Sequence, residues 1–195
     1  MTKPSTTTRA RPFYVMGCEG VFPSTALGTR PDLPRGPWMT GQRITYDVPT
    51  PLVYGLDPDY PGELLAMYKS AAPLMRAELL AALSDAGVDN LQLFDAVLRD
   101  PLKGTEHKDY KAVNVVGVVA AADLGASQMM GTTDSTLIDA DFHRLAFRED
   151  VPTDLLLFRL AESVNAIVVH DRVKRRIESA GIPGMTFYAS NEWSG

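Results

Sequence analysis

The sequence predicts an α+β fold, in which a mainly antiparallel sheet with a central strand near residues 113–120 is covered by two or more helices. The most apolar run of the chain, residues 110–123, is rich in β-branched valines, which favour a strand. Two segments, centred near Ala81 and Arg175, carry apolar residues at helical spacing. Short gaps between the apolar segments near the end of the chain favour hairpin-like connections.

The predicted central strand is apolar on both of its faces. Successive side chains of a strand point to opposite faces, and valines occupy both parities between Val113 and Val119. We therefore expect other elements to cover the strand on both sides. Asn114 is its one polar residue and, as a buried amide, needs hydrogen-bond partners. Gly117 marks a bulge or the close approach of another backbone.

The first half of the chain predicts few long elements. Residues 1–12 are polar and predict a flexible arm, ahead of a single globular domain at 13–195. Glycine and proline are frequent from 17 to 51, and Trp38 is expected to anchor this segment to the core. The predicted elements are strands at 13–16, 43–48, 52–56 and 91–94, a helical turn at 64–68 and a helix at 76–86.

The second half contains most of the apolar segments. A flexible stretch is predicted at 125–135, and the apolar residues of 137–147 change parity, which predicts a bulge or two short strands. Asp171 is predicted to be the N-cap of the last helix, and Gly181 its stop. The remaining predictions are a loop at 102–109, a turn at 148–152, strands at 155–160, 166–169 and 185–188, and a polar tail at 191–195.

One segment of the chain resembles another. The helix, glycine stop and strand around Gly87 recur around Gly181, 94 residues later, with apolar residues at matching positions. A duplication would produce this pattern. Because a helix followed by glycine and a strand is a common local arrangement, convergence explains it equally well.

Composition limits the function classes. The 195 residues carry a formal net charge of −5, which argues against non-specific nucleic-acid binding and leaves room for a basic partner. No apolar run approaches the roughly 20 residues that span a membrane. The segment Val15–Cys18 is similar to a lipoprotein cleavage site, but the apolar stretch before it is too short for a signal peptide. With one cysteine and no signal, a cytoplasmic location is expected.

Motifs that carry catalytic chemistry were not found. There is no glycine-rich phosphate loop before a helix, no cysteine pair and no Gly-x-Ser-x-Gly. We therefore expect no cofactor and no metal. The three histidines are far apart in sequence, and a metal site would require them to meet aspartates in the fold. The residues concerned are His107, His143 and His170 with Asp109, Asp139 and Asp141.

Charged residues cluster in two places. The densest acidic region offers either a solvated edge or a contact surface for a basic protein partner. Its members, which are the predicted partner-binding residues, are Asp134, Asp139, Asp141, Glu149 and Asp150. The basic cluster lies away from the apolar stripe of the last helix, so we expect a solvated face there. Its members are Arg172, Lys174, Arg175 and Arg176.

Three stretches together resemble a known family. They are Tyr110-Lys-Ala-Val-Asn-Val-Val-Gly-Val-Val119, the strand Leu155–Leu160, and the run from Ile167 to Phe187 that includes Ala180-Gly-Ile182. The chain is similar here to bacterial immunity proteins of polymorphic toxin systems, in the group catalogued as immunity family eleven. The segment from Leu52 to Phe94 also resembles a subgroup of that family.

The resemblance implies a protein without catalytic activity that binds and blocks a cognate toxin domain, in many such systems a nuclease. The same resemblance implies that the toxin is encoded by the neighbouring gene. It carries over no contact residues, because the shared motifs lie on apolar strands and glycine stops. The segment 17–51 departs from shorter members, and we expect it to set partner choice. Two alternatives stay open at this point: a small metal-dependent hydrolase using His107 and His143 with nearby aspartates, and a protein that self-associates through a sheet edge.

Overall fold

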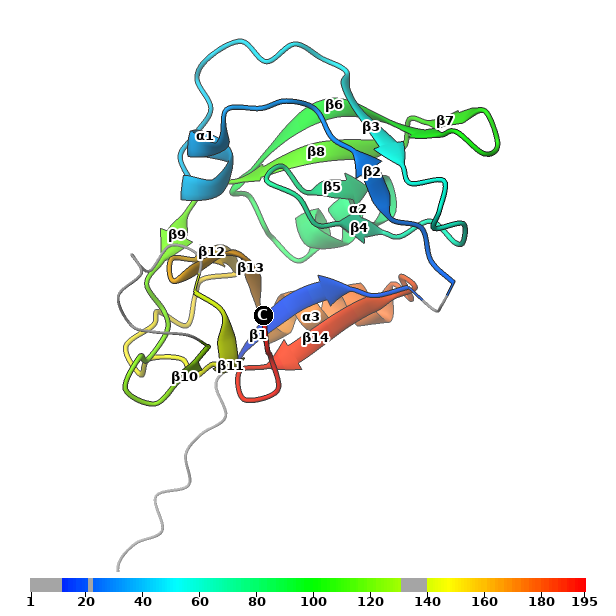
Figure 1. Cartoon of the computed structure of the whole chain (residues 1–195). Coiled ribbons are helices and arrows are strands. Elements are labelled where there is room, and N and C mark those ends of the chain that lie inside the picture. Colours follow the sequence, from blue (N-terminus) through cyan, green and yellow to red (C-terminus); the bar gives the residue numbers. More distant parts are fainter. Residues whose placement is uncertain (1–11, 21–22, 131–139) are drawn as a thin grey trace, which may run out of the picture.

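The protein is mainly β, with two large sheets, one small sheet and three short helices in the part described here (Figure 1). The computed structural model describes residues 12–20, 23–130 and 140–195. Nine of the eleven strand pairings in these ranges are antiparallel, whereas β3–β6 and β9–β12 are parallel. The α+β class is thus confirmed in its coarse form, with mixed sheets and more β-structure than expected.

The larger sheet has seven strands and curls into a half-barrel. Its order is β2-β3-β6-β8-β5-β4, with β7 paired to β6. The hairpin of β6 and β7 replaces part of the loop predicted at 102–109. The strands are β2 (Leu27–Thr29), β3 (Leu52–Leu56), β4 (Met67–Tyr68), β5 (Leu74–Arg76), β6 (Leu91–Asp100), β7 (Thr105–His107) and β8 (Tyr110–Val115).

The second sheet has five strands in the order β14-β1-β13-β12-β9. It joins the two ends of the described chain, because β1 pairs with both β13 and β14. Its strands are β1 (Phe13–Cys18), β9 (Val118–Val119), β12 (Leu157–Leu160), β13 (Ser163–His170) and β14 (Met185–Ala189), and a separate pair is formed by β10 (Gln128–Met129) and β11 (Phe142–Arg144). The predicted polar tail is also anchored, since Trp193 is buried and Gly195 exchanges backbone hydrogen bonds with Phe142.

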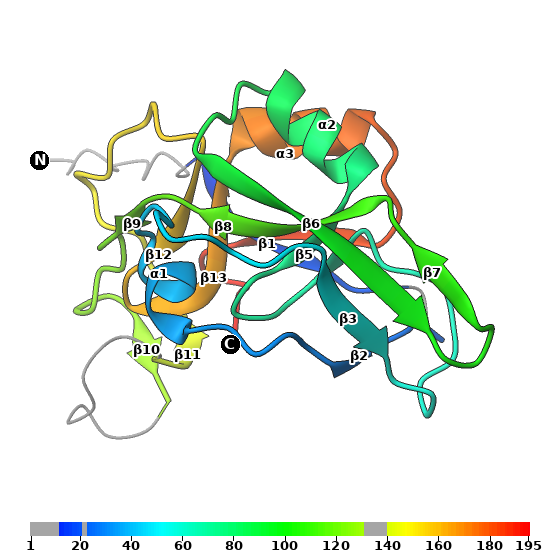
Figure 2. The same ribbon diagram turned by 90° about the horizontal axis from the view of Figure 1, so that it is seen from above.

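The two predicted helices are confirmed as α2 (Ala77–Asp85) and α3 (Asp171–Ser179), which pack against each other (Figure 2). The N-cap of α3 is His170 rather than Asp171, because the His170 Nδ1 accepts a hydrogen bond from the Arg172 backbone N–H. A third helix, α1 (Arg35–Thr40), lies in the glycine- and proline-rich segment and was not predicted.

Both large sheets are covered on both faces, as the apolar parities predicted. In β8, Val113 and Val115 face a cluster shared with α2 and α3, whereas Tyr110 and Ala112 face a cluster closed by the segment before β3. In the second sheet, the face opposite α3 is covered by the chain between β9 and β12 and by Trp193. Helices α2 and α3 therefore cover one face of each sheet. The other face is covered by α1 and irregular chain in the first sheet, and by the chain between β9 and β12 with Trp193 in the second.

The predicted continuous strand at 113–120 is wrong, because the chain divides into β8 and β9, which belong to different sheets. The break lies at Gly117, whose φ of +122° is a conformation that residues with a side chain rarely adopt. The Val116 N–H donates to the Asn90 carbonyl and the Gly117 N–H to the Gly41 carbonyl. The prediction that another backbone approaches Gly117 closely is confirmed.

Two side-chain amides, those of Asn114 and Gln92, attach the segment after α1 to the first sheet. Asn114 is fully buried, and its Nδ2 donates to the Gln42 carbonyl at 2.8 Å and to the Gln92 Oε1 at 2.9 Å. Gln92 also bonds both backbone groups of Ile44, at 2.7 and 3.1 Å. The partners predicted for Asn114 are thus present. Because the Ile44 backbone is occupied by a side chain, the strand predicted at 43–48 does not form.

Two further expectations concern the segment before β5. The helical turn predicted at 64–68 is wrong, because the Leu65 carbonyl accepts from the Tyr110 hydroxyl and the Ala66 carbonyl from the Arg76 N–H. These bonds run across the sheet rather than along a helix. The anchoring role of Trp38 is confirmed: its side chain is fully buried, contacts the Phe94 ring, and donates from Nε1 to the Tyr46 hydroxyl at 3.0 Å.

Candidate functional site

The acidic residues predicted to bind a partner are placed on the segment that covers the second sheet. Asp134 and Asp139 lie outside the described residues. Asp141 is exposed directly before β11, and Glu149 and Asp150 are exposed in the turn that follows Phe147. We call Asp141, Glu149 and Asp150 the acidic surface.

The charge of the acidic surface is partly neutralised by the neighbouring Arg148. Asp150 forms two hydrogen bonds with the guanidinium of Arg148, with an ion-pair distance of 2.5 Å. This carboxylate raises the pKa of Arg148. Asp123, on the neighbouring turn, accepts hydrogen bonds from the Gly125 and Ala126 backbone. The predicted turn at 148–152 is therefore exposed except at Val151, and it contains a local ion pair.

The histidines do not meet. His107 lies on β7 in the first sheet, His143 is exposed on β11, and His170 caps α3. Asp109, the nearest candidate to His107 in sequence, is paired with Arg76 at 2.7 Å. Within residues 12–20, 23–130 and 140–195, no three His, Cys, Asp or Glu side chains form a metal-binding group.

The basic cluster of the last helix is also largely neutralised, as a solvated face would be. Lys174 pairs with Glu178 and Arg175 with Asp171, each at 2.7 Å and four residues apart. Arg176 reaches α2 and pairs with its Asp85 at 2.5 Å.

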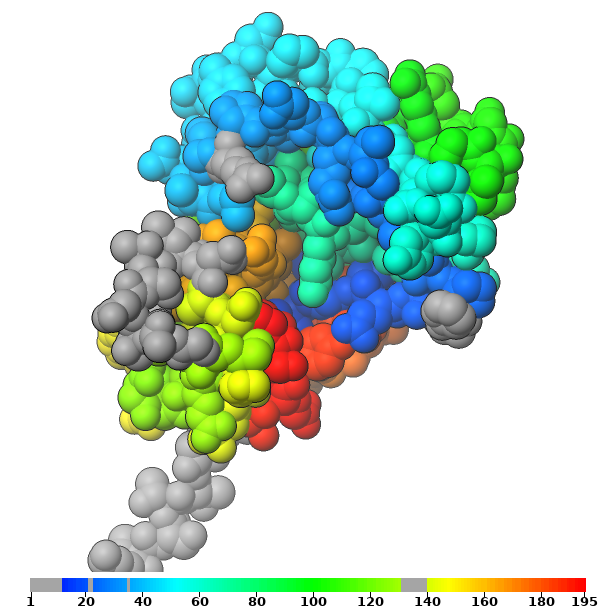
Figure 3. Space-filling model, viewed as in Figure 1, coloured from blue at the N-terminus to red at the C-terminus, as the bar shows by residue number. Residues whose placement is uncertain are grey.

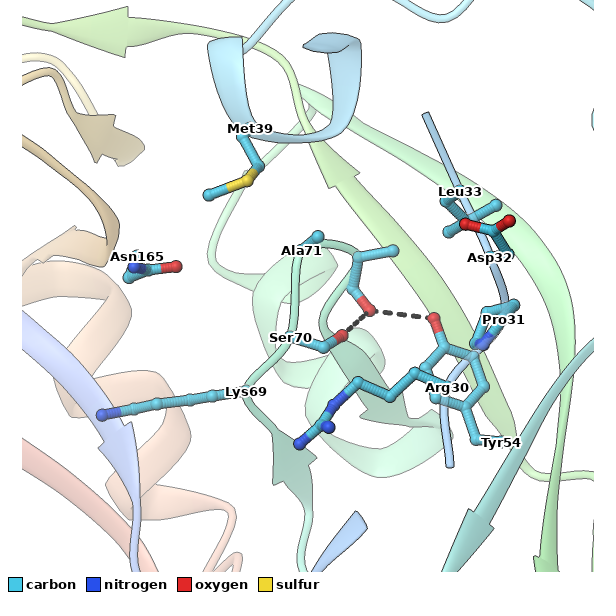
Figure 4. Close-up of a pocket in the computed structure, with 11 residues that line it drawn as sticks. Arg30, Pro31, Asp32, Leu33, Met39, Tyr54, Lys69, Ser70, Ala71 and Asn165 are labelled. Atoms are coloured by element: carbon cyan, nitrogen blue, oxygen red, sulfur yellow. Dashed lines mark hydrogen bonds between the residues drawn. The ribbon is translucent and has the colours of Figure 1, made fainter. Parts of the chain in front are cut away.

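A cavity of about 560 Å³ opens between the two large sheets (Figures 3 and 4). We call it the intersheet cleft. Figure 4 shows Asn165 of β13 and Lys69 on one side of the Ser70–Ala72 turn, and Arg30 and Tyr54 of β3 on the other. The full lining is Arg30, Pro31, Asp32, Leu33, Met39, Tyr54, Lys69, Ser70, Ala71, Ala72 and Asn165.

The Tyr54 and Ser70 hydroxyl groups of the cleft both donate hydrogen bonds within the protein. The Tyr54 hydroxyl donates to the Ala72 carbonyl at 2.9 Å, and the Ser70 hydroxyl donates to the same oxygen. Burial raises the pKa of Tyr54 to about 12, although the nearby Arg30 cation acts in the opposite direction. Tyr54 is therefore neutral, and the charged donors at the cleft are the exposed side chains of Arg30 and Lys69.

A buried cation stands behind the wall of the cleft. Arg159 of β12 is only 1% exposed. Its guanidinium donates to the Val164 carbonyl at 2.7 Å and to the carbonyl of Ala71, a lining residue, at 3.3 Å. Its Nε has no partner, and no carboxylate pairs with it in the described chain. Desolvation lowers its pKa to about 10, so the side chain remains charged at neutral pH.

The intersheet cleft was missed in the sequence. Its lining comes from four separate segments, near residues 30, 54, 70 and 165, which the fold brings together. Nothing in the sequence around Arg30 and Lys69 marks a site, since Asp32 lies two residues from Arg30 and such spacing of charges is common in ordinary loops.

The sequence matches the model of a known protein family. The model of a family described as Immunity protein family (Imm11) matches residues 84–192, which is more than half of the chain. No curated protein matches the sequence significantly. In the described ranges, the helices are all too short or too polar to cross a membrane.

Proposed function

The chain belongs to the immunity protein family Imm11, and from this premise we propose that it binds and neutralises a cognate bacterial toxin domain without catalysing a reaction. The family match is the observation that carries the proposal. The matched region includes β6, β8, β12, β13, α3 and β14, which build the scaffold of both sheets.

Charge supports a basic toxin domain as the partner, and a nuclease is the toxin class we propose. The protein carries a formal net charge of −5. We propose the acidic surface as part of the contact region, with Asp134 and Asp139 as further members. Opposite charges on two partners steer their encounter and raise the association rate, and this effect falls as salt rises.

Co-expression tests the function itself. The toxin domain encoded beside this gene, expressed alone, is expected to stop growth of a bacterial host. Its co-expression with this protein is expected to restore growth, and the purified pair is expected to form a stable complex. Absence of both rescue and binding would overturn the proposal.

The acidic surface is tested separately by charge reversal. The variant Asp141→Lys, Glu149→Lys, Asp150→Lys is expected to slow association with the toxin by about 10-fold at low salt, with much less effect at high salt. The control is Asp59→Lys, Glu63→Lys, Asp89→Lys, which changes the net charge equally at exposed positions elsewhere. Equal slowing by both variants would show that net charge acts, and not this surface.

A further inference from the structure

The intersheet cleft gathers cations that lack acidic partners. Two other cations of the larger sheet are paired with carboxylates, Arg99 with Glu106 and Lys111 with Asp95. Arg30 and Lys69 form no ion pair with any described residue, although both line the cleft. The lining also includes the exposed carboxylate of Asp32, so it carries two cations against one anion in a protein of net charge −5.

Arg159 adds a second, independent observation. Burying a charge without a counter-ion is costly, because water no longer solvates it. The Arg159 guanidinium is held by two carbonyls, one of which belongs to the cleft lining, while its Nε hydrogen bonds to no described group. An anion that enters the cleft would compensate this charge together with those of Arg30 and Lys69.

The residues that line the cleft lie mostly outside the part of the chain that matches the family. Apart from Asn165, every lining residue precedes residue 84, where the family match begins. The cleft therefore belongs to the part of this chain that lies outside the matched region. Its volume of about 560 Å³ is large for a single small ion, and Leu33 and Met39 give its walls an apolar part.

We propose that the intersheet cleft receives a carboxylate side chain, together with its apolar neighbours, from a projecting loop of the toxin domain. This inference rests on the proposed function and adds the anchoring site. The carboxylate is bound by the guanidinium of Arg30 and the ammonium of Lys69, which are the charged donors on its sides. The acidic surface affects how fast the partners meet, whereas the cleft holds the complex together.

The test is a pair of charge-matched variants assayed with the toxin domain encoded beside this gene. Arg30→Glu, Lys69→Glu reverses the two cations of the cleft. Arg43→Glu, Lys108→Glu makes the same change at two exposed cations outside it. Because an anchoring charge pair is worth several kcal/mol, the cleft variant is expected to weaken the complex by about 100-fold or more, mainly through faster dissociation. The control variant is expected to change affinity by less than about 3-fold.

The outcomes of this test distinguish failure of the cleft proposal from failure of the proposed function. If the unmodified protein binds the toxin and both variants bind equally well, the cleft proposal is wrong and the proposed function stands. If the unmodified protein neither binds nor rescues, both are overturned. Inorganic phosphate is the probe for the other possible occupant: saturable binding to the cleft with no loss of toxin affinity in Arg30→Glu, Lys69→Glu would assign the site to a small anion instead. Circular dichroism of each variant verifies that it is folded.

Discussion

The two helices that pack against each other belong to two units of the same geometry but of very different composition. In the first βαβ unit, β5, α2 and β6 enclose β8. In the second βαβ unit, β13, α3 and β14 enclose β1. The exposed positions of α3 are mostly charged, whereas α2 is rich in alanine and leucine. Yet the buried pair Leu79 and Leu83 of α2 corresponds to Val173 and Ile177 of α3, again 94 residues later.

The agreement extends to the register of the enclosed strands. Before each helix, the last strand residue pairs with the first residue of the enclosed strand: Arg76 with Tyr110, and His170 with Phe13. After each helix, Leu91 pairs with Val115 and Met185 with Cys18, the last residue of that strand. Both enclosed strands have six residues. In chain order, however, β8 follows its unit and β1 precedes its unit.

The units differ in what covers their outer faces. The segment before β3 covers the first βαβ unit and supplies five of the eleven residues that line the intersheet cleft. The chain between β9 and β12 covers the second and carries the acidic surface. The repeated geometry therefore serves as the scaffold, and the two surfaces that we propose for partner binding lie on or beside the parts that are not repeated.

The largest expected effect comes from the shared buried positions. Leu83→Ala and Ile177→Ala each remove a fully buried side chain at corresponding positions of the same apolar cluster. Each substitution is expected to lower the free energy of unfolding by about 3 kcal/mol, measured by urea denaturation. If one of them cost less than about 1 kcal/mol, the two units would not contribute equally to the core.

The connection between the sheets depends on Gly117. Gly117→Ala places a side chain on a residue with φ of +122°, although the added Cβ would meet only Asn90, at 3.8 Å. The cost is therefore one of backbone strain, about 1–3 kcal/mol, measured as a lower melting temperature. Gly36→Ala is the control, because Gly36 lies in α1 with no atom within 4 Å of the added Cβ. Alanine is expected to stabilise that position by about 0.5–1 kcal/mol, so an effect of the same sign at both sites would contradict the account.

The sequence predicted an element correctly where a local pattern determines the backbone conformation, and failed where contacts with distant parts of the chain determine it. The stripes of α2 and α3 and the short apolar runs at 13–16 and 52–56 are local, and those elements formed where expected. The division of the central strand was not predicted, because Gly117 adopts its conformation against Gly41 and Arg159, which are far away in sequence. The absence of a strand at 43–48 has the same kind of cause, since Gln92 occupies the Ile44 backbone. To predict the cleft, four segments that are far apart in the sequence would have had to be placed together.

A side-chain amide also links the two large sheets. Asn90 donates from Nδ2 to the Val116 carbonyl at 2.8 Å and to the Leu157 carbonyl at 3.0 Å, so it bridges the end of β8 and the start of β12. Asn90→Ala is expected to cost about 1–2 kcal/mol of unfolding free energy, because both acceptors lose a partner. The neighbouring exposed Asp89→Ala is expected to change it by less than about 0.5 kcal/mol. If Asn90→Ala and Asp89→Ala had similar effects, the Asn90 amide would not join the two large sheets.

The smallest expected effect is that of the ion pair between the two helices. Asp85 and Arg176 are 2.5 Å apart, but their side chains are 55% and 41% exposed. Water and salt screen such a pair, so a double-mutant cycle of Asp85→Asn and Arg176→Gln is expected to give a coupling of about 0.2–0.5 kcal/mol that disappears at about 1 M salt. A coupling above about 1 kcal/mol that persisted in salt would mean that charge aligns the helices. The expected small value leaves that alignment to the apolar residues that occupy corresponding positions in α2 and α3, which is why the two helices can differ so much in charge.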